Sequence, residues 1–169
     1  RQNCLLWQPF PLVIVPPFFD HPAYLDAMTS VCARHLETFA PDHVLFSFHG
    51  LPVRHIQNGC SDGSCLRDPA CCDTLTPQNA RCYRAQCVAA AQLLAARLGL
   101  HDDDFEVAFQ SRMGKTTWIG PFSDERIRAL PAEGKQKLAI ICPSFVADCL
   151  ETLHEIGVEA NRHFLQAGG

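Results

Sequence analysis

Apolar runs of strand length alternate with longer stretches of helical periodicity along this chain. The apolar runs predict strands at residues 12–15, 44–48, 105–109 and 138–142. Helical spacing and start signals predict helices at about 20–39, 78–98, 123–130 and 148–164. Strands that alternate with helices indicate an α/β fold, a parallel sheet with helices on both faces. Residues 52–77 show no apolar periodicity and are expected to form a long loop.

The helix expected after the last strand carries two rows of side chains. Asp148 is a suitable N-cap, and Glu151 follows it at the spacing of a capping box. One row is apolar and is expected to face the core; it consists of Leu150, Leu153, Gly157, Ala160 and Phe164. The other row is acidic, because Glu151, Glu155 and Glu159 lie four residues apart. Three stacked carboxylates repel one another, and a bound cation would relieve this repulsion. The alternative is that Glu151 caps the helix while Glu155 and Glu159 form a solvated surface.

Polar residues directly follow three of the predicted strands. His49 ends the second strand, residues 110–118 follow the third, and residues 143–151 follow the fourth. Because the carboxyl ends of parallel strands meet at one edge of a sheet, these segments are expected to converge there. The sequence therefore predicts a functional site at this edge.

Composition limits the classes of function. The 169 residues predict one domain that covers 1–169, and a net charge of −4 without a basic stripe argues against a nucleic-acid partner. No apolar run reaches the length of a membrane span and no signal peptide pattern is present, so a cytoplasmic location is predicted. The chain begins at Arg1 in mid-pattern, which is typical of a piece of a longer protein.

Several segments share the order and spacing of the motifs of a known family. They are FSFHGLP at 46–52, YRAQC at 83–87, FQSR at 109–112 followed by Gly114 and Trp118, CPSF at 142–145, ETL at 151–153 and the closing AGG at 167–169. In this respect the chain resembles the carboxyl-terminal half of ferrochelatases. The resemblance implies a chelatase-like, Rossmann-type half of an enzyme that inserts ferrous iron into a porphyrin in haem biosynthesis. The amino-terminal half of the same protein would be its missing partner.

The resemblance also implies roles for individual residues. His49 matches the histidine of the family's HGxP segment and Glu151 the glutamate of its ETL segment; the pair would bind the incoming iron and accept the pyrrole protons. Glu155 and Glu159 match acidic residues that resemble a path for iron or protons, and Trp118 matches an aromatic residue near the porphyrin. The chemistry needs a base for two N–H protons and ligands that hold and then release iron, which an imidazole opposite a carboxylate provides. The alternatives are a backbone-bonded loop residue for His49 and core packing for Trp118.

Two other functions are open at this stage. A half-length chelatase of the cobalt or sirohydrochlorin type would act as a homodimer whose second copy completes the pocket. A non-catalytic metal-binding module would use only the cysteine-rich segment, so that no activity would depend on His49 or Glu151.

A cysteine-rich insert at about residues 60–82 predicts a metal centre. Ferrochelatases without this feature lack roughly twenty of these residues, and such a long loop usually has a function. Four thiolates close in sequence suit a [2Fe-2S] cluster or a structural zinc ion, which would order a segment that has no core of its own. Some ferrochelatases carry a [2Fe-2S] cluster, and this resemblance favours iron–sulfur over zinc. A disordered or disulfide-bonded loop is the alternative.

The predicted ligands of this centre are Cys60, Cys65, Cys71 and Cys72. Cys82 is a reserve candidate, and Cys87 is set aside because its YRAQC segment occurs with or without the insert. In several cluster-containing relatives most ligands lie near the carboxyl terminus, beyond the end of this chain, so the arrangement here departs from theirs.

Overall fold

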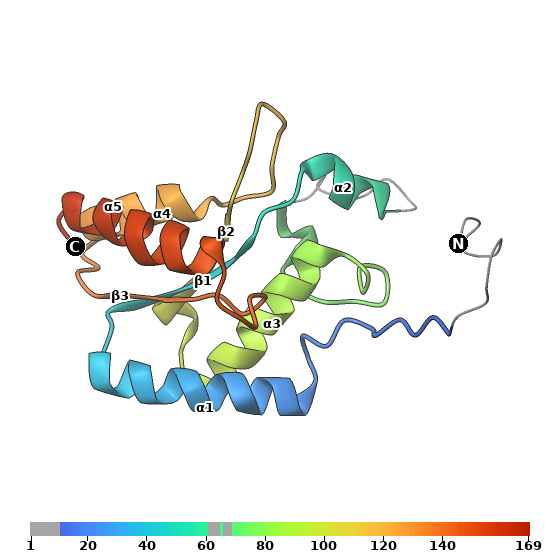
Figure 1. Cartoon of the computed structure of the whole chain (residues 1–169), viewed down its shortest axis with the longest axis horizontal. Helices are drawn as coiled ribbons and strands as arrows, with labels where there is room; N and C mark the ends of the chain where they lie inside the picture. Colours follow the sequence, from blue (N-terminus) through green and yellow to red (C-terminus); the bar gives the residue numbers. More distant parts are fainter. Residues whose placement is uncertain (1–10, 61–64, 66–68) are drawn as a thin grey trace.

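Three parallel strands form the sheet in a computed structural model that describes residues 11–60, 65 and 69–169 (Figure 1). The central strand is β1 (His43–His49), with β2 (Phe105–Gln110) on one side and β3 (Leu138–Ile141) on the other. His49 pairs with Gln110 at the carboxyl ends of β1 and β2. The predicted parallel α/β architecture is thus confirmed, whereas residues 61–64 and 66–68 of the predicted insert lie outside the described residues.

Helices cover both faces of the sheet (Figure 1). On one face lie α1 (Pro22–Phe39) and α3 (Tyr83–Leu98); on the other lie α4 (Ser123–Ala129), the π-helix η4 (Glu151–Ala160) and α5 (Asn161–Gln166). The connections contain the helix α2 (Val53–Asn58) and the 3-10 turns η1 (Pro69–Cys72), η2 (Asp102–Asp104) and η3 (Leu130–Glu133). In the part of the chain that the structure describes, no helix has the length and apolar character needed to cross a membrane.

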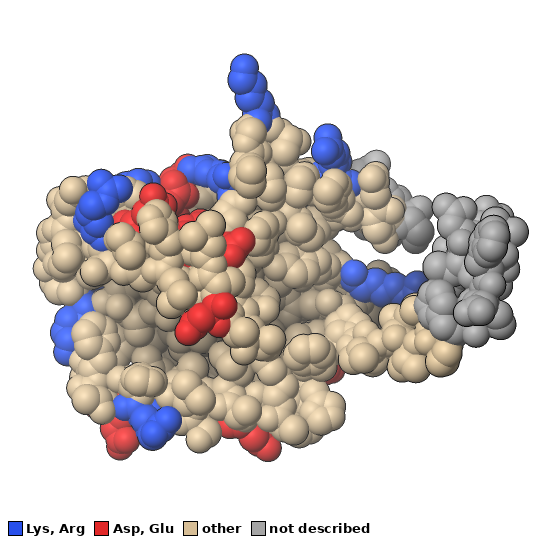
Figure 2. All heavy atoms as spheres, in the orientation of Figure 1, with Lys and Arg blue, Asp and Glu red and all other residues tan. Residues whose placement is uncertain are grey.

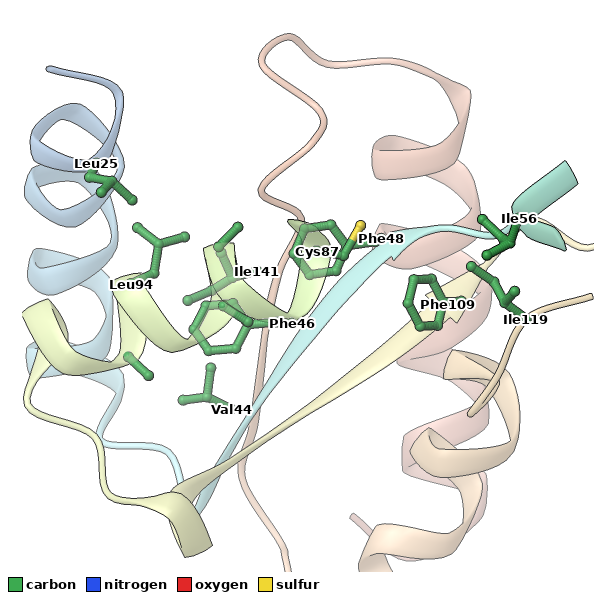
Figure 3. Packing of buried hydrophobic residues seen from close by; sticks show 13 residues of the cluster. Leu25, Val44, Phe46, Phe48, Ile56, Cys87, Leu94, Phe109, Ile119 and Ile141 are labelled. Atoms are coloured by element: carbon green, nitrogen blue, oxygen red, sulfur yellow. The ribbon is translucent and has the colours of Figure 1, made fainter. Parts of the chain in front are cut away.

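Successive residues of β1 contribute to two separate cores. Val44, Phe46 and Phe48 join the cluster between the sheet and the helices α1 and α3, which Figure 3 shows from close by. Leu45 belongs to the second cluster, together with Ile127 of α4 and residues of η4 and α5. Because β1 is buried on both faces, its sequence is a continuous apolar run rather than an alternating one.

Residues 12–15 do not form the predicted strand. Their side chains are exposed, Leu12 by 65% and Val13 by 83%, and the segment pairs with no strand among the described residues. An apolar run becomes a strand only where a sheet edge offers hydrogen-bond partners, which the apolar pattern alone does not reveal.

The segment before α3 also differs from the prediction. Helix α3 begins at Tyr83 rather than near residue 78, because Asn79 stabilises a turn instead. Its side chain accepts a hydrogen bond from the Thr76 N–H at 2.7 Å and donates to the carbonyls of Cys71 and Thr74 at 3.0 and 2.9 Å. Such local bonds compete with helix formation. The predicted loop 52–77 contains α2, whose six residues are too few to show periodicity.

The helix after β3 departs from the predicted apolar row. In a π-helix each hydrogen bond spans one residue more than in an α-helix, so residues at α-helical spacing do not share one face. Leu150 and Leu153 are therefore exposed by 74% and 60%, while Ile156, Ala160 and Phe164 pack against the second core. Of the five residues predicted to face the core, only Ala160 and Phe164 do so.

The predicted capping box at the start of this helix is absent. Asp148 makes no N-cap bond; its carboxylate accepts only from the Thr152 hydroxyl, at 3.5 Å. The Thr152 Oγ1 atom instead accepts from the Cys149 N–H at 3.0 Å. Glu151 therefore does not complete a capping box with Asp148.

His43 begins β1 inside the fold and is 7% exposed. Neither ring nitrogen has a hydrogen-bond partner. Burial lowers the pKa of His43; the nearby Glu106 and Glu133 oppose this effect, and Lys135 and Arg126 add to it. The unfolded chain therefore binds this proton more readily than the folded one, and the free energy of unfolding should fall as the pH drops below about 6.5.

Replacement of His43 by leucine should reduce this loss of stability in acid. The measurement is the free energy of unfolding of the complete protein in urea from about pH 7.5 to 5.5. His154→Leu, which changes an exposed histidine of η4, is the matched control and should keep the wild-type pH dependence. An unchanged pH dependence in His43→Leu would contradict the assignment.

Candidate active site

His49 stands where the central strand leaves the sheet. Its side chain is half-buried, and its Nδ1 atom lies 2.6 Å from the carbonyl oxygen of Gly50. Because a carbonyl only accepts hydrogen bonds, Nδ1 carries the proton and Nε2 has a free lone pair. The Tyr83 hydroxyl donates to the His49 carbonyl at 2.9 Å and holds the backbone in place. The imidazole is thus held in a tautomer whose Nε2 can accept a proton.

Gly50 lets the segment after β2 pack closely against β1. A Cβ atom here would lie 2.9 Å from the Gln110 carbonyl oxygen and 3.3 Å from Trp118 Cε3, so a larger residue would force these groups apart. The Gly50 N–H donates to that carbonyl at 2.7 Å, and the Trp118 indole N–H donates to the Met113 carbonyl at 2.9 Å. Trp118 is therefore held, half-buried, beside the end of β1.

Gln110 joins the sheet to the last helix. Its Oε1 atom accepts from the Ser47 hydroxyl at 2.7 Å and from the Cys142 thiol at 3.7 Å. Its Nε2 atom donates to the Glu151 carbonyl at 3.2 Å and to the Glu155 carboxylate at 3.3 Å. Only 4% of Gln110 is exposed, and a satisfied buried network of this kind sets one arrangement of its members. The sequence did not single out Gln110, although Ser47 and Gln110 are polar residues inside apolar strands.

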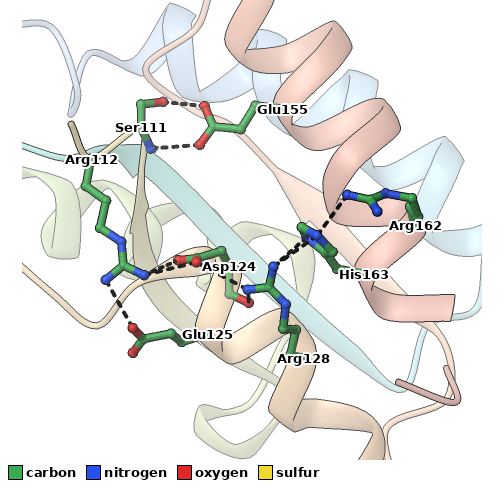
Figure 4. A network of polar contacts seen from close by, with 8 residues as sticks. All are labelled: Ser111, Arg112, Asp124, Glu125, Arg128, Glu155, Arg162 and His163. Atoms are coloured by element: carbon green, nitrogen blue, oxygen red, sulfur yellow. Dashed lines mark hydrogen bonds and ion pairs between the residues drawn. The ribbon is translucent and has the colours of Figure 1, made fainter. Parts of the chain in front are cut away.

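Glu155 is bound to the turn that follows β2. The Ser111 N–H donates to its carboxylate at 2.8 Å, and the Ser111 hydroxyl donates to it as well (Figure 4). Ser111 has a φ of 65°, in the left-handed region, and this turn directs both donors toward the helix. The middle carboxylate of the predicted acidic row is thus an anchored group rather than a solvated one.

Loss of the Glu155 carboxylate should destabilise the protein. Glu155→Ala removes the acceptor for the Ser111 and Gln110 donors, and hydrogen bonds to charged groups contribute about 1.5–3 kcal/mol. We expect the free energy of unfolding to fall by about this amount in urea titrations. The exposed Glu159 offers the matched control, since Glu159→Ala should change stability by less than about 0.5 kcal/mol. Equal effects of the two substitutions would contradict this view of Glu155.

Glu155 and Glu159 both line a cavity of about 240 Å³ between β2, α4 and η4. Asp124, Arg128 and His163 line its other side; Arg128 lies 3.3 Å from Asp124 and 3.0 Å from His163 (Figure 4). On the molecular surface, acidic side chains lie near the amino-terminal end of η4, and basic side chains lie toward the end of α5 (Figure 2). The structure therefore brings two of the three predicted carboxylates onto one cavity.

Glu151 lies outside the lining of this cavity, on the side of His49. The pKa of Glu151 is lowered, first by a hydrogen bond from its own backbone N–H, then by the Cys149 thiol and by the charge of His49. His49 and Glu151 are thus within electrostatic reach of each other at the carboxyl edge of the sheet. Phe145 lies at the same edge, with its ring centroid 6.4 Å from that of His49.

Comparison with known proteins identifies the family. The ferrochelatase family model matches residues 5–169. This chain belongs to the ferrochelatase family. Ferrochelatases of Ectopseudomonas mendocina and Pseudomonas fluorescens biotype C are 47% and 48% identical to it over 92% of its length, and a ferrochelatase of Coxiella burnetii is 43% identical over 94%. These alignments cover only 46%, 46% and 45% of the three relatives, so the chain spans about half the length of the curated relatives it matches.

Five cysteines of this ferrochelatase chain line one cavity of about 410 Å³ beside α2: Cys60, Cys65, Cys71, Cys72 and Cys82. The Cys72 Sγ atom lies 3.4 Å from Cys71 Sγ and 3.8 Å from Cys82 Sγ, and the Cys65 N–H donates to Cys60 Sγ at 3.3 Å. Cys65, Cys71, Cys72 and Cys82 are free thiols. The structure therefore gathers the four predicted ligands together with the reserve candidate, whereas Cys87 is not part of this lining.

The donor set of this cavity fits a metal centre, although it is not arranged as a finished site. Among the described residues, no group of three or more His, Cys, Asp or Glu side chains is positioned to hold a metal ion. Cys72 is 1% exposed; burial raises its pKa to about 12, and the Arg84 guanidinium acts in the opposite direction. The Nη1 atom of Arg84 is buried without a hydrogen-bond partner. A thiolate bound to a metal would supply the acceptor that this nitrogen lacks.

Proposed function

We propose that the complete protein, this chain together with an amino-terminal half, inserts ferrous iron into a porphyrin in haem biosynthesis. Membership of the ferrochelatase family supports this, and it favours a ferrochelatase over a half-length chelatase or an inert metal-binding module. The observation that carries the proposal is the pair at the sheet edge: His49 with a free Nε2 and Glu151 with a lowered pKa. A cytoplasmic location is part of the same proposal.

Iron insertion exchanges two pyrrole N–H protons for one ferrous ion without a change of oxidation state. His49 accepts protons at Nε2, and the Gly50 carbonyl stabilises the resulting imidazolium through its bond to the Nδ1 proton. Glu151, whose lowered pKa keeps it ionised at neutral pH, offers a carboxylate to the incoming iron. Glu155 and Glu159 supply further oxygen atoms along a path for iron or protons, and Trp118 provides an aromatic contact for the porphyrin.

The exposed apolar surface before and along η4 supports the need for an amino-terminal half. Val146, Leu150 and Leu153 are exposed by 71%, 74% and 60%. Apolar side chains gathered in this way usually form an interface or a ligand pocket. We assign this surface to the cleft that the two halves form around the porphyrin.

The cysteine-lined cavity is the proposed site of a [2Fe-2S] cluster, with zinc as the less favoured occupant. The proposed ligands are Cys60, Cys65, Cys71 and Cys72; Cys82 is a further candidate because it lines the same cavity. When bound, the metal would supply order, since its thiolate bonds would join Cys60 and Cys65 to Cys71 and Cys72.

Two measurements on the complete protein test these proposals. Haem formation from ferrous iron and protoporphyrin or coproporphyrin is expected, and inactivity toward both porphyrins would overturn the enzymatic proposal. Absorption between roughly 330 and 550 nm with about two irons per chain and acid-labile sulfide is expected for the cluster. Zinc in a colourless protein would overturn the cluster and leave the enzymatic proposal standing.

A further inference from the structure

Arg84 lies in the first turn of α3, next to the cysteine-lined cavity. Its Nη1 atom is buried and has no hydrogen-bond partner, and among the described residues no Asp or Glu forms an ion pair with it. The residue as a whole is half-buried, but a buried N–H group without an acceptor is costly, because it has lost water without gaining a partner. This position therefore calls for a negative group nearby.

The groups around Arg84 are thiols. Its guanidinium interacts with the side chain of Cys72, which is 1% exposed, and its charge also reaches Cys87. The Cys72 sulfur lies 3.8 Å from that of Cys82, which occupies the N-cap of α3 and makes no side-chain cap bond. A helix of this length favours negative charge at its amino-terminal end. Two independent features, the unpartnered Nη1 atom of Arg84 and the amino-terminal end of α3, thus favour anionic sulfur near Cys72 and Cys82.

We propose that Arg84 is the counter-cation of the metal centre, donating a hydrogen bond to the Cys72 sulfur when that sulfur is a metal-bound thiolate. This inference rests on the metal centre proposed above and adds a residue outside its ligand set. Four thiolates leave both a zinc ion and an oxidised [2Fe-2S] cluster with a net negative charge, so the role of Arg84 does not depend on which metal is bound. Arg84 is a positioning residue, because it acts through the ligand rather than on the metal.

Arg81 provides a contrast within the same cavity. Arg81 lines the cavity directly, which Arg84 does not, but Arg81 is exposed, so water screens its charge. A general effect of positive charge on the centre would involve both arginines. A hydrogen bond to a buried ligand would involve Arg84 alone.

The test compares metal retention in the wild type, Arg84→Gln, Arg84→Lys and the control Arg81→Gln, all in the complete protein. Purified proteins are titrated with EDTA, and bound iron, sulfide and zinc are followed together with the visible spectrum. We expect Arg84→Gln to weaken metal retention about 10- to 100-fold, as loss of an outer-shell partner typically does. Arg84→Lys should restore most of this loss, and Arg81→Gln should match the wild type. In a [2Fe-2S] protein the midpoint potential of Arg84→Gln should also fall, because reduction adds negative charge that Arg84 no longer offsets.

Three outcomes would overturn the inference. Wild-type retention and potential in Arg84→Gln would overturn it while leaving the metal centre in place. Equal losses in Arg84→Gln and Arg81→Gln would assign the effect to general charge. A wild-type protein without bound metal would remove the centre itself and this inference with it. Far-ultraviolet circular dichroism of the metal-free proteins shows whether Arg84→Gln folds, and the potential of the fraction that keeps its metal still tests the hydrogen bond if it folds poorly.

Discussion

Replacement of His49 by alanine in the complete protein should abolish iron insertion, with turnover reduced by about 10²- to 10⁴-fold. The variant loses the Nε2 atom that is proposed to accept the pyrrole protons and the imidazole whose charge reaches Glu151. The fold should persist, because within the described part of the chain the His49 side chain hydrogen-bonds only to the adjacent Gly50 carbonyl. Haem formation under anaerobic conditions measures the first effect, and thermal unfolding measures the second.

The control for this substitution is His154→Ala, which removes an exposed histidine from η4. It lies on the same helix as Glu151 but outside the sheet edge, so its activity should equal that of the wild type. An active His49→Ala enzyme would refute the catalytic assignment. An inactive His154→Ala enzyme would show instead that any histidine change near this helix disturbs the site.

The sheet was predictable because its strands are buried on both faces. The runs at 44–48, 105–109 and 138–142 contain few polar residues, and each became a strand within one residue of the predicted bounds at either end. The run at 12–15 has the same composition but no partner strand among the described residues. Composition thus indicated which segments could enter a sheet, whereas pairing decided which of them did.

The sequence predicted the position of the helix that carries the acidic residues, but not its hydrogen-bond pattern or the face that it buries. Its hydrogen-bond period was not predictable, because apolar residues such as Leu150 and Leu153 fit an α-helical stripe in the sequence yet remain exposed in the π-helix. The roles of Gln110 and Ser111 depend on a turn with positive φ and on contacts across 41 to 45 positions of sequence. Neither feature leaves a local pattern in the sequence.

For the cysteine cluster, in contrast, a local sequence pattern predicted the kind of site. The spacing of the cysteines predicted a metal centre, and the structure places all four predicted ligands around one cavity. What the spacing could not show is that Cys82 comes within 3.8 Å of Cys72 and that Arg84, with a buried and unpartnered Nη1 atom, lies near them. The choice among five thiols therefore depends on three-dimensional packing, and substitution can decide it.

Replacement of Cys72 by serine should reduce bound metal by more than about tenfold, at least as much as loss of an outer-shell partner. Cys72 is the most buried of the cavity cysteines, and its sulfur lies within 3.8 Å of two other thiols, which makes it the central member of the proposed ligand set. Iron, sulfide and zinc analysis of the purified complete protein measures the loss. If the metal orders this segment as proposed, the variant should also be cleaved faster by protease within residues 60–82.

Cys87→Ser is the matched control, since Cys87 is 4% exposed but does not line the cavity. It should keep the full metal content, and a loss equal to that of Cys72→Ser would show that burial of a thiol matters rather than ligation. Cys71→Ser and Cys82→Ser then decide the fourth ligand. Metal loss in Cys71→Ser alone supports the predicted set, whereas loss in Cys82→Ser alone replaces Cys71 by Cys82, the residue that α3 holds at its amino-terminal end.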